Sequence, residues 1–145
     1  MSKAEDAVKN FENYNCAQSV LTAYAGDFDL PKEKALQTAV GFGGGMGRLQ
    51  ETCGAVSGAI SVLGLSSGFK EGDGRDKINK SYADIRRLVS DFTQKHGTVR
   101  CRDLLDGCDL MTEEGQKTFK DNNLREHCQN YIKLCCDLLD EYLKE

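Results

Sequence analysis

The sequence predicts an all-α fold: a single-domain helical bundle of about five to seven helices over residues 1–145, with a glycine-rich loop before its central helix. Two observations predict it. The chain has one proline, Pro31, and no run of β-branched residues, so little interrupts helix formation. Apolar residues recur at helical spacing in several segments, and 145 residues are enough to bury one core.

Composition limits the class of protein. Charged residues make up 29% of the chain and the net charge is −4, which is typical of a globular protein and argues against a dedicated nucleic-acid binder. The N-terminal stretch is charged, and no run approaches the ~18 apolar residues of a membrane span. We therefore expect a cytoplasmic protein without membrane insertion. Seven cysteines in such a chain indicate metal binding or redox catalysis rather than a disulfide framework.

The first two helices are predicted on either side of a break at residues 13–15. Apolar residues at helical spacing favour a helix over residues 3–14, but that face does not continue through Cys16. Asn15 is a suitable N-cap for a second helix, and Gln18 completes a capping box. Cys16 is then the first residue of this second helix.

A third helix is predicted over residues 32–42, because Pro31 suits a first helical turn. The run GFGGGMG follows at residues 41–47. It predicts a loop shaped for close backbone approach, since glycine tolerates positive φ. No lysine followed by serine or threonine completes a Gly-x4-Gly frame, so a nucleotide-binding loop is not expected.

The central helix is predicted to begin at Cys53, with Thr52 as its N-cap. It carries almost no charge (GAVSGAISVLGL), which is typical of a buried helix. Gly54 and Gly58 leave one face nearly without side chains, so a neighbouring backbone can approach Cys53 closely. The free amides of the first turn favour negative charge, and we expect them, with Arg48 nearby, to lower the pKa of Cys53. The competing interpretation is that Cys53 is a small buried hydrophobic residue.

The second half of the chain predicts further helices. A long amphipathic helix is expected over residues 76–95, and a weak helical turn over residues 112–121. Thr98 is the expected N-cap of a short helix whose third residue is Cys101. Asn123, with a glutamate three positions later, predicts a capping box for the final helix.

Four cysteines share one predicted location, the first or second turn of a helix: Cys16, Cys53, Cys101 and Cys128. If these helix starts converge, their dipoles point at one group of sulfurs and stabilise thiolates or a thiolate–metal centre. Spacing does not show which of them meet, because they are far apart along the chain. For each, the alternative is a buried cysteine that only packs.

The other cysteines are expected to lie outside such a site. Cys135 belongs to an apolar stripe of the final helix and is expected in the core, with Cys136 beside it, whereas Cys108 lies in a polar turn and is expected to be exposed. The chain has no Cys-x-x-Cys pair, so neither a zinc ribbon nor a thioredoxin-type pair is predicted. His127 adjoins Cys128 and is either a base or ligand, or a surface residue near a helix start.

Taken in order, the segments NCAQ, CGAVSG, CRDLL and CQNYI resemble the C_GCAxxG_C_C family of redox-active proteins. The resemblance spans nearly the whole chain, and Cys-Gly-Ala-x-x-Gly is its specific part. It implies a small soluble protein of anaerobic bacteria or archaea with four characteristic cysteines, here Cys16, Cys53, Cys101 and Cys128. The family is also similar to part of the split-Soret cytochromes, but the haem attachment motif is missing here, so haem is not implied.

Three functions remain open from the sequence. In the first, Cys16, Cys53, Cys101 and Cys128 hold an iron–sulfur cluster or another thiophilic metal for electron transfer or sensing, since four thiolates are the usual complement of such a cluster. In the second, Cys53 is the catalytic nucleophile of a thiol/disulfide redox protein. In the third, the protein is a helical binding module with structural cysteines. The first two require a redox partner; whether the chain is an enzyme or a homodimer stays open.

Overall fold

The computed structural model describes residues 1–145 and is all-α. Seven α segments span eight residues or more, which agrees with the predicted number: α1 Lys3–Asn10, α2 Cys16–Ala25, α3 Lys32–Ala39, α5 Gly54–Ser67, α6 Arg75–His96, α8 Glu113–Asp121 and α9 Arg125–Leu143. Two four-residue segments and two 3-10 turns complete the chain: α4 Gly43–Met46, α7 Cys101–Leu104, η1 Gly26–Phe28 and η2 Val40–Phe42. None of the helices combines the length and the apolar character that a membrane crossing needs.

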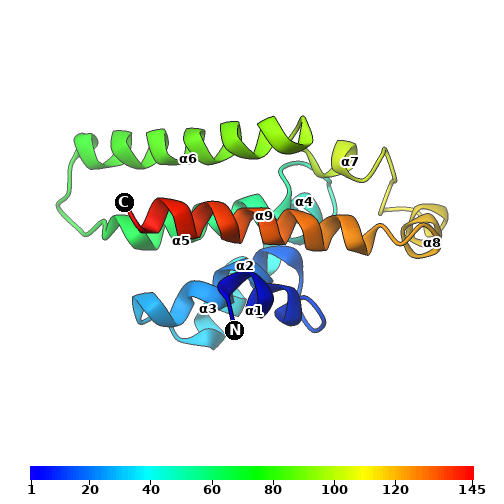
Figure 1. The fold of residues 1–145 in the computed structure, drawn as a ribbon, viewed down its shortest axis with the longest axis horizontal. Helices are drawn as coiled ribbons and strands as arrows, with labels where there is room; N and C mark the ends of the chain where they lie inside the picture. Colours follow the sequence, from blue (N-terminus) through cyan, green and yellow to red (C-terminus); the bar gives the residue numbers. More distant parts are fainter.

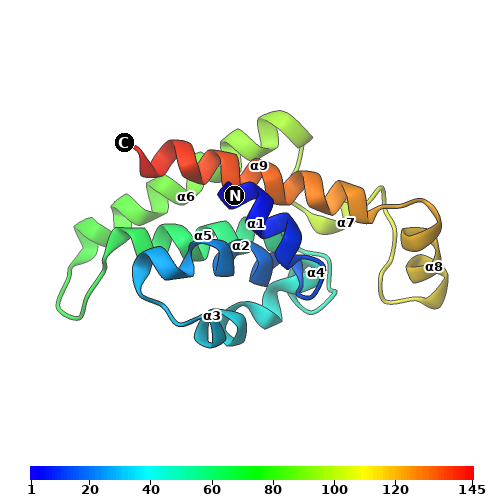
Figure 2. The same ribbon diagram turned by 60° about the horizontal axis from the view of Figure 1, so that its bottom comes forward.

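Helices α5 and α9 form the centre of the bundle (Figure 1). Helix α6 packs along one side of this pair, α1 and α2 pack against the other side, and α3 packs on α2. Figure 2 shows α8 standing apart from the bundle at one end, connected to α7 and α9 by loops. The start of α9 and the short helix α7 lie at this same end of the bundle.

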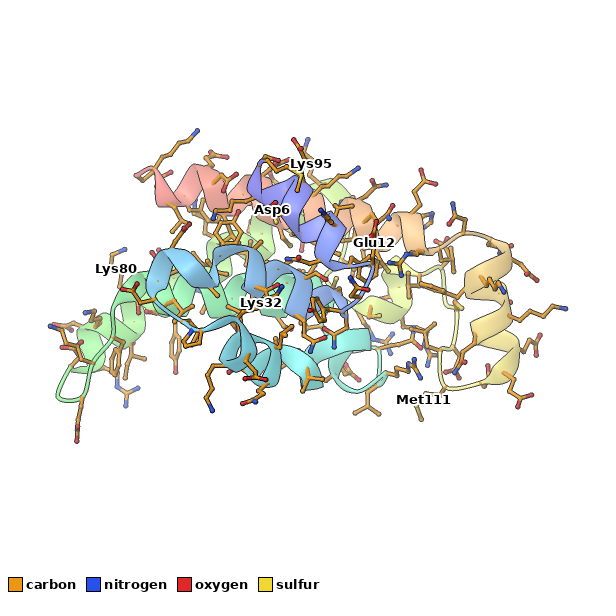
Figure 3. All side chains as sticks on the ribbon, turned by 90° about the horizontal axis from the view of Figure 1, so that it is seen from below. Asp6, Glu12, Lys32, Lys80, Lys95 and Met111 are labelled. Atoms are coloured by element: carbon orange, nitrogen blue, oxygen red, sulfur yellow. The ribbon has the colours of Figure 1, made fainter.

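The uncharged helix α5 is the most buried element, as the sequence predicts. Its first six residues are all buried, and it packs against α2, α6 and α9. Charged side chains lie at the surface: Glu12, Lys32, Lys80 and Lys95, which are labelled in Figure 3, are all exposed. Most buried apolar side chains form one core around α5, and four more form a smaller cluster beside it.

Two glycines of α5 allow α2 to lie against it. A Cβ atom at Gly58 would stand 2.7 Å from the carbonyl oxygen of Ala17, and a Cβ atom at Gly54 would occupy the position of the Cys16 sulfur. Neither position has room for a Cβ atom, so the close approach of the two helices expected from these glycines is confirmed.

The helix starts differ in how well the local sequence predicts them. Helix α2 begins at Cys16 with the predicted capping box between Asn15 and Gln18. Helix α5 begins one residue later than predicted, so that Cys53 is its N-cap instead of its first residue. The reason is tertiary: Thr52 is held in an antiparallel bridge to another segment and does not cap the helix.

The start of α7 is also different from the prediction. Cys101 is its first residue rather than its third, and the Thr98 hydroxyl accepts a hydrogen bond from the amide of Arg100 outside the helix. Asn123 does pair with the carboxylate of Glu126, but it lies one residue before the N-cap of α9, with φ of 51°. The third predicted helix ends at Ala39, and residues 40–42 form the turn η2 instead.

Candidate functional site

The glycine-rich segment between α3 and α5 is a series of left-handed residues. Gly44, Gly45 and Gly47 have φ values of 65°, 67° and 60°. Met46 and Arg48 have φ values of 68° and 65°, although neither is a glycine. A side chain in this conformation costs about 1–2 kcal/mol, so the surrounding structure must hold the segment in place.

Gln50 helps to hold the glycine-rich segment in place. Its side chain is fully buried; its Nε2 atom donates to the Cys108 carbonyl at 2.7 Å, and its Oε1 atom accepts from the Leu110 amide at 2.8 Å. Its own amide donates to the Gly44 carbonyl at 3.0 Å. Gln50 therefore ties the glycine-rich segment to the chain that precedes α8. The sequence alone does not single out Gln50, because nothing distinguishes it from other polar residues until residues 108–110 are placed beside it.

A short antiparallel pairing brings Cys53 and Cys101 together. The Cys53 amide donates to the Val99 carbonyl at 2.7 Å, and the Cys101 amide donates to the Glu51 carbonyl at 2.6 Å. Between these bonds lies the bridge that joins Thr52 to the residue before Cys101. The pairing fixes the starts of α5 and α7 next to each other, although they are almost fifty positions apart along the chain.

The four characteristic cysteines line one cavity of about 620 Å³: Cys16, Cys53, Cys101 and Cys128. Each comes from a different element: the first residue of α2, the N-cap of α5, the first residue of α7 and the first turns of α9. Cys53 is 7% exposed and Cys101 is 8% exposed, whereas the other two are half-buried. The convergence of these helix starts, which spacing alone does not reveal, is thus a property of the fold.

The rest of the cavity wall is mostly apolar. Phe11 at the end of α1, Tyr131 of α9 and Phe119 of α8 contribute aromatic rings to it. Tyr131 is fixed there by a hydrogen bond from its hydroxyl to the Leu104 carbonyl at 2.7 Å. The sequence identifies Tyr131 only as a core residue and does not identify Phe119 as part of a site, since α8 is a weak helical signal far from the other elements.

The pKa of each of the four cysteine thiols is raised, which favours the neutral thiol over the thiolate. Burial raises the pKa of Cys101 to about 11 and that of Cys128 to about 12, and the neighbouring Cys16 adds to both shifts. Burial also raises the pKa of Cys53 well above its ordinary value, with Cys16 again the next cause. The predicted lowering of the Cys53 pKa is therefore wrong: amides of the first turn act in that direction, but loss of solvation outweighs them.

Cys16 lies at the centre of the group. Its pKa is raised by burial, and it perturbs the pKa of each of the other three cysteines. The backbone amides of Gly44, Ala17 and Gly54 act in the opposite direction, because they favour negative charge on the Cys16 sulfur. The glycine-rich segment and the starts of α2 and α5 thus surround this sulfur with hydrogen-bond donors.

The arrangement contains free thiols and no preformed site for a single ion. All seven cysteines are free, and no three histidine, cysteine, aspartate or glutamate side chains lie close enough together to bind one metal ion. The four sulfurs share one cavity.

The remaining cysteines do not reach the cavity. Cys135 and Cys136 are fully buried in the core, as expected for Cys135. Cys108 is buried as well, and the predicted exposure is wrong because α8 covers it: its thiol donates to the Gly115 carbonyl at 3.0 Å. His127 adjoins Cys128 in sequence but does not line the cavity.

Comparison with known proteins identifies the family. A model of the family described as "Putative redox-active protein (C_GCAxxG_C_C)" matches residues 14–142. The chain belongs to this family. In the C_GCAxxG_C_C label a glycine precedes the central cysteine, whereas this chain has Cys53 before Gly54.

A relative from Archaeoglobus fulgidus, described as an uncharacterized protein, is 27% identical over 113 residues. The similarity covers 73% of this chain and 75% of the relative. No solved structure matches the chain. The family model and the relative thus assign the chain to a family whose description is "Putative redox-active protein", and neither names a cofactor or a substrate.

Proposed function

We propose that Cys16, Cys53, Cys101 and Cys128 bind an iron–sulfur cluster and that the protein uses it for electron transfer or sensing. One observation carries the proposal: these four cysteines come from four separate elements and line the same cavity, while the other three do not. Four cysteine thiolates are the usual ligand set of such clusters.

The protonation of the thiols favours a ligand role over a nucleophilic role. A thiol whose pKa is raised to about 11, as at Cys101, is almost entirely neutral near pH 7 and is a poor nucleophile. A bound metal removes this obstacle, because it displaces the proton from a coordinating thiol. Buried neutral thiols that converge on a cavity are therefore better suited to hold a metal centre than to attack a substrate.

Four cysteine ligands suit a polynuclear cluster, which is held by four thiolates and places its irons between them. The cavity of about 620 Å³ leaves room for such a group. When bound, the cluster supplies one-electron chemistry that no side chain of this chain provides.

The residues around the sulfurs complement a negative centre. The amides of Ala17, Gly44 and Gly54 favour charge on the Cys16 sulfur, and hydrogen bonds to cluster sulfurs are one of the features by which a protein sets the potential. Most of the cavity wall around these sulfurs is apolar. The protein thus provides ligands, hydrogen-bond donors and an apolar surface.

The test is the iron and acid-labile sulfide content of protein purified without oxygen. We expect a brown protein whose absorption disappears on oxidation or chelation. Serine at any one of Cys16, Cys53, Cys101 or Cys128 should strongly reduce the iron content. Cys108→Ser is the matched control, because a hydroxyl can keep the hydrogen bond to Gly115 and the residue is outside the cavity. Equal iron content in all five variants, or no iron in the wild-type protein, would contradict the proposal.

A thiol/disulfide function is the second candidate, since Cys16 and Cys53 are neighbours. The position of the Cys16 sulfur leaves no space for a Cβ atom at Gly54, the residue after Cys53. If this candidate is right, anaerobically purified protein is colourless and mild oxidation removes two thiols. Peptide mapping would then recover a disulfide between Cys16 and Cys53.

A further inference from the structure

Exposed apolar side chains gather around the mouth of the cavity. Nine large hydrophobic residues of the chain are exposed, and five of them lie in residues 40–49 or at residue 111: Val40, Phe42, Met46, Leu49 and Met111. These five residues form what we call the apolar rim. Single exposed apolar residues are ordinary on a protein surface, whereas a group of them marks an interaction site.

The two segments of the apolar rim are held side by side. The side chain of Gln50, the residue after Leu49, accepts a hydrogen bond from the amide of Leu110, the residue before Met111, at 2.8 Å. Val40 and Gly47 line the cavity and are also exposed. The cavity therefore opens to solvent within the apolar rim, and a molecule that binds to the rim covers this opening.

Met46 is presented to solvent by a strained backbone. It has φ of 68°, a conformation that glycine adopts without strain and that its neighbours Gly45 and Gly47 also adopt. Its side chain is exposed, so burial in the core does not explain why this position carries a methionine. Methionine side chains adapt to irregular surfaces and are common where proteins bind one another. Met46 thus has the properties of a contact residue.

The charges beside the apolar rim are balanced. Residues 40–51 contain one cation, Arg48, and one anion, Glu51; both are exposed, and neither takes part in an ion pair of the chain. A two-fold interface brings the same surface of two copies together, so it needs charges that complement themselves. This segment meets that need. A charged redox protein would instead be steered by an excess of one sign, which residues 40–51 do not have.

We propose that the apolar rim is the interface of a two-fold dimer, in which a second copy of this chain covers the mouth of the cavity. The apolar side chains lie at the centre of the interface, and Arg48 of each copy pairs with Glu51 of the other. Each copy then closes the cavity of its neighbour at the face they share. The inference goes beyond cluster binding and does not depend on it, because no cavity cysteine takes part in the interface.

The test is sedimentation velocity of the full-length, reduced and metal-free protein over a series of concentrations. We expect a monomer–dimer equilibrium that Leu49→Glu weakens by at least about tenfold, because a carboxylate would be buried between the two copies. Tyr82→Glu is the matched control and should leave the equilibrium unchanged, since Tyr82 is an exposed residue of α6 outside the rim. Thermal unfolding should show that both variants fold as the wild-type protein does.

Charge reversal tests the predicted pairing of Arg48 with Glu51. Arg48→Glu and Glu51→Arg each place like charges opposite one another, so each should weaken dimerisation about tenfold. The double variant should dimerise as the wild type does, because opposite charges face each other again. An equal mixture of the two single variants should also dimerise, since every pair in the mixed dimer joins unlike charges. A change in the fold of the monomer would not produce this pattern.

A protein that stays monomeric at every concentration would overturn the proposal. So would a dimer that Leu49→Glu leaves intact, or a monomer that binds a redox protein through the apolar rim. Iron content is measured on separate anaerobic samples, so a failure of dimerisation and a failure of cluster binding are distinguished.

Discussion

Gly54 and Gly64 lie in the same helix but have opposite surroundings. A Cβ atom at Gly54 would overlap the Cys16 sulfur and stand 3.0 Å from the Phe42 carbonyl oxygen, whereas nothing lies within 4 Å of one at Gly64. We predict that Gly54→Ala destabilises the fold by about 1–3 kcal/mol through overpacking. Gly64→Ala should instead stabilise it by about 0.5–1 kcal/mol, because alanine favours the helix interior. Urea unfolding of both variants measures the difference, and shifts of the same sign would contradict the close packing of α2 on α5.

The raised pKa values of the cysteine thiols predict how the stability of the protein depends on pH. In the metal-free reduced protein the pKa of Cys101 is about 11, above its ordinary value of 9.0. Between these two values the folded state holds a proton that the unfolded state has lost, so stability is constant below about pH 9 and falls as pH rises toward 11. Each such thiol contributes up to about 1.4 kcal/mol per pH unit in that window.

The measurement is the urea midpoint between pH 7 and pH 11. We expect a flat profile up to pH 9 and then a decline that is less steep in Cys101→Ser, because serine does not titrate there. Cys101 also helps to raise the pKa values of Cys128 and Tyr131, so the difference between the two slopes measures Cys101 together with its effect on these neighbours. A midpoint that rises above pH 9, or identical slopes in the two proteins, would show that Cys101 is not held as a buried thiol.

At the scale of elements, the start of α2 determines where Cys16 lies. The side chain of Asn15 accepts from the Gln18 amide at 3.0 Å and also donates to the Val40 carbonyl at 2.9 Å, so it joins the helix start to the turn before the glycine-rich segment. A Cβ atom at Gly43 would overlap this same side chain. One asparagine therefore positions both walls of the cavity beside Cys16.

We predict that Asn15→Ala destabilises the protein by about 1–2 kcal/mol, the usual cost of a lost N-cap. The variant should also retain less iron, because the Cys16 sulfur is no longer held against the glycine-rich segment. Asn13→Ala is the control, since Asn13 is exposed and lies before the helix; it should change stability by less than about 0.5 kcal/mol. Thermal unfolding and iron analysis check both statements, and equal behaviour of the two variants would count against the role of the cap.

For the whole molecule, the interior does not depend on the four sulfurs. The main core contains 23 buried residues, and of the four cavity cysteines only Cys53 is among them. The helices therefore have an apolar core of their own, unlike small domains that fold only around a metal. Helix α8, which closes one end of the cavity, belongs to a smaller separate cluster with Cys101 and Cys108.

We predict that metal-free protein keeps its helical far-ultraviolet circular dichroism and melts at a lower temperature than cluster-loaded protein. Binding to the folded state alone adds about 2.7 kcal/mol when the ligand is at one hundred times its dissociation constant. Circular dichroism before and after anaerobic chelation is the measurement. Loss of the helical signal on chelation would mean that the cluster is needed for folding.

The sequence predicts features that depend on neighbouring residues, and it does not predict features that depend on contacts with distant segments. The capping box at Asn15 and the burial of Cys135 follow from neighbouring residues, and both are confirmed. The start of α5 is displaced by one residue because a distant segment bridges to Thr52. Cys108 is buried because α8 folds over it.

The candidate site is predicted in its residues but not in its chemistry. Helix starts and the resemblance to the family single out the four cysteines, and the structure places them in one cavity. The expected lowering of the Cys53 pKa fails, because burial depends on the whole fold and outweighs a helix start. Gln50, whose hydrogen bonds hold the strained loop, has no sequence signal at all.

The most direct test of the account is the location of iron in a crystal of anaerobically reconstituted protein, from anomalous scattering at the iron absorption edge. We predict one strong peak inside the cavity, with cysteine sulfurs from α2, α5, α7 and α9 around it. A peak at Cys108, Cys136 or His127, or an iron-loaded crystal with no peak in the cavity, would contradict the central claim.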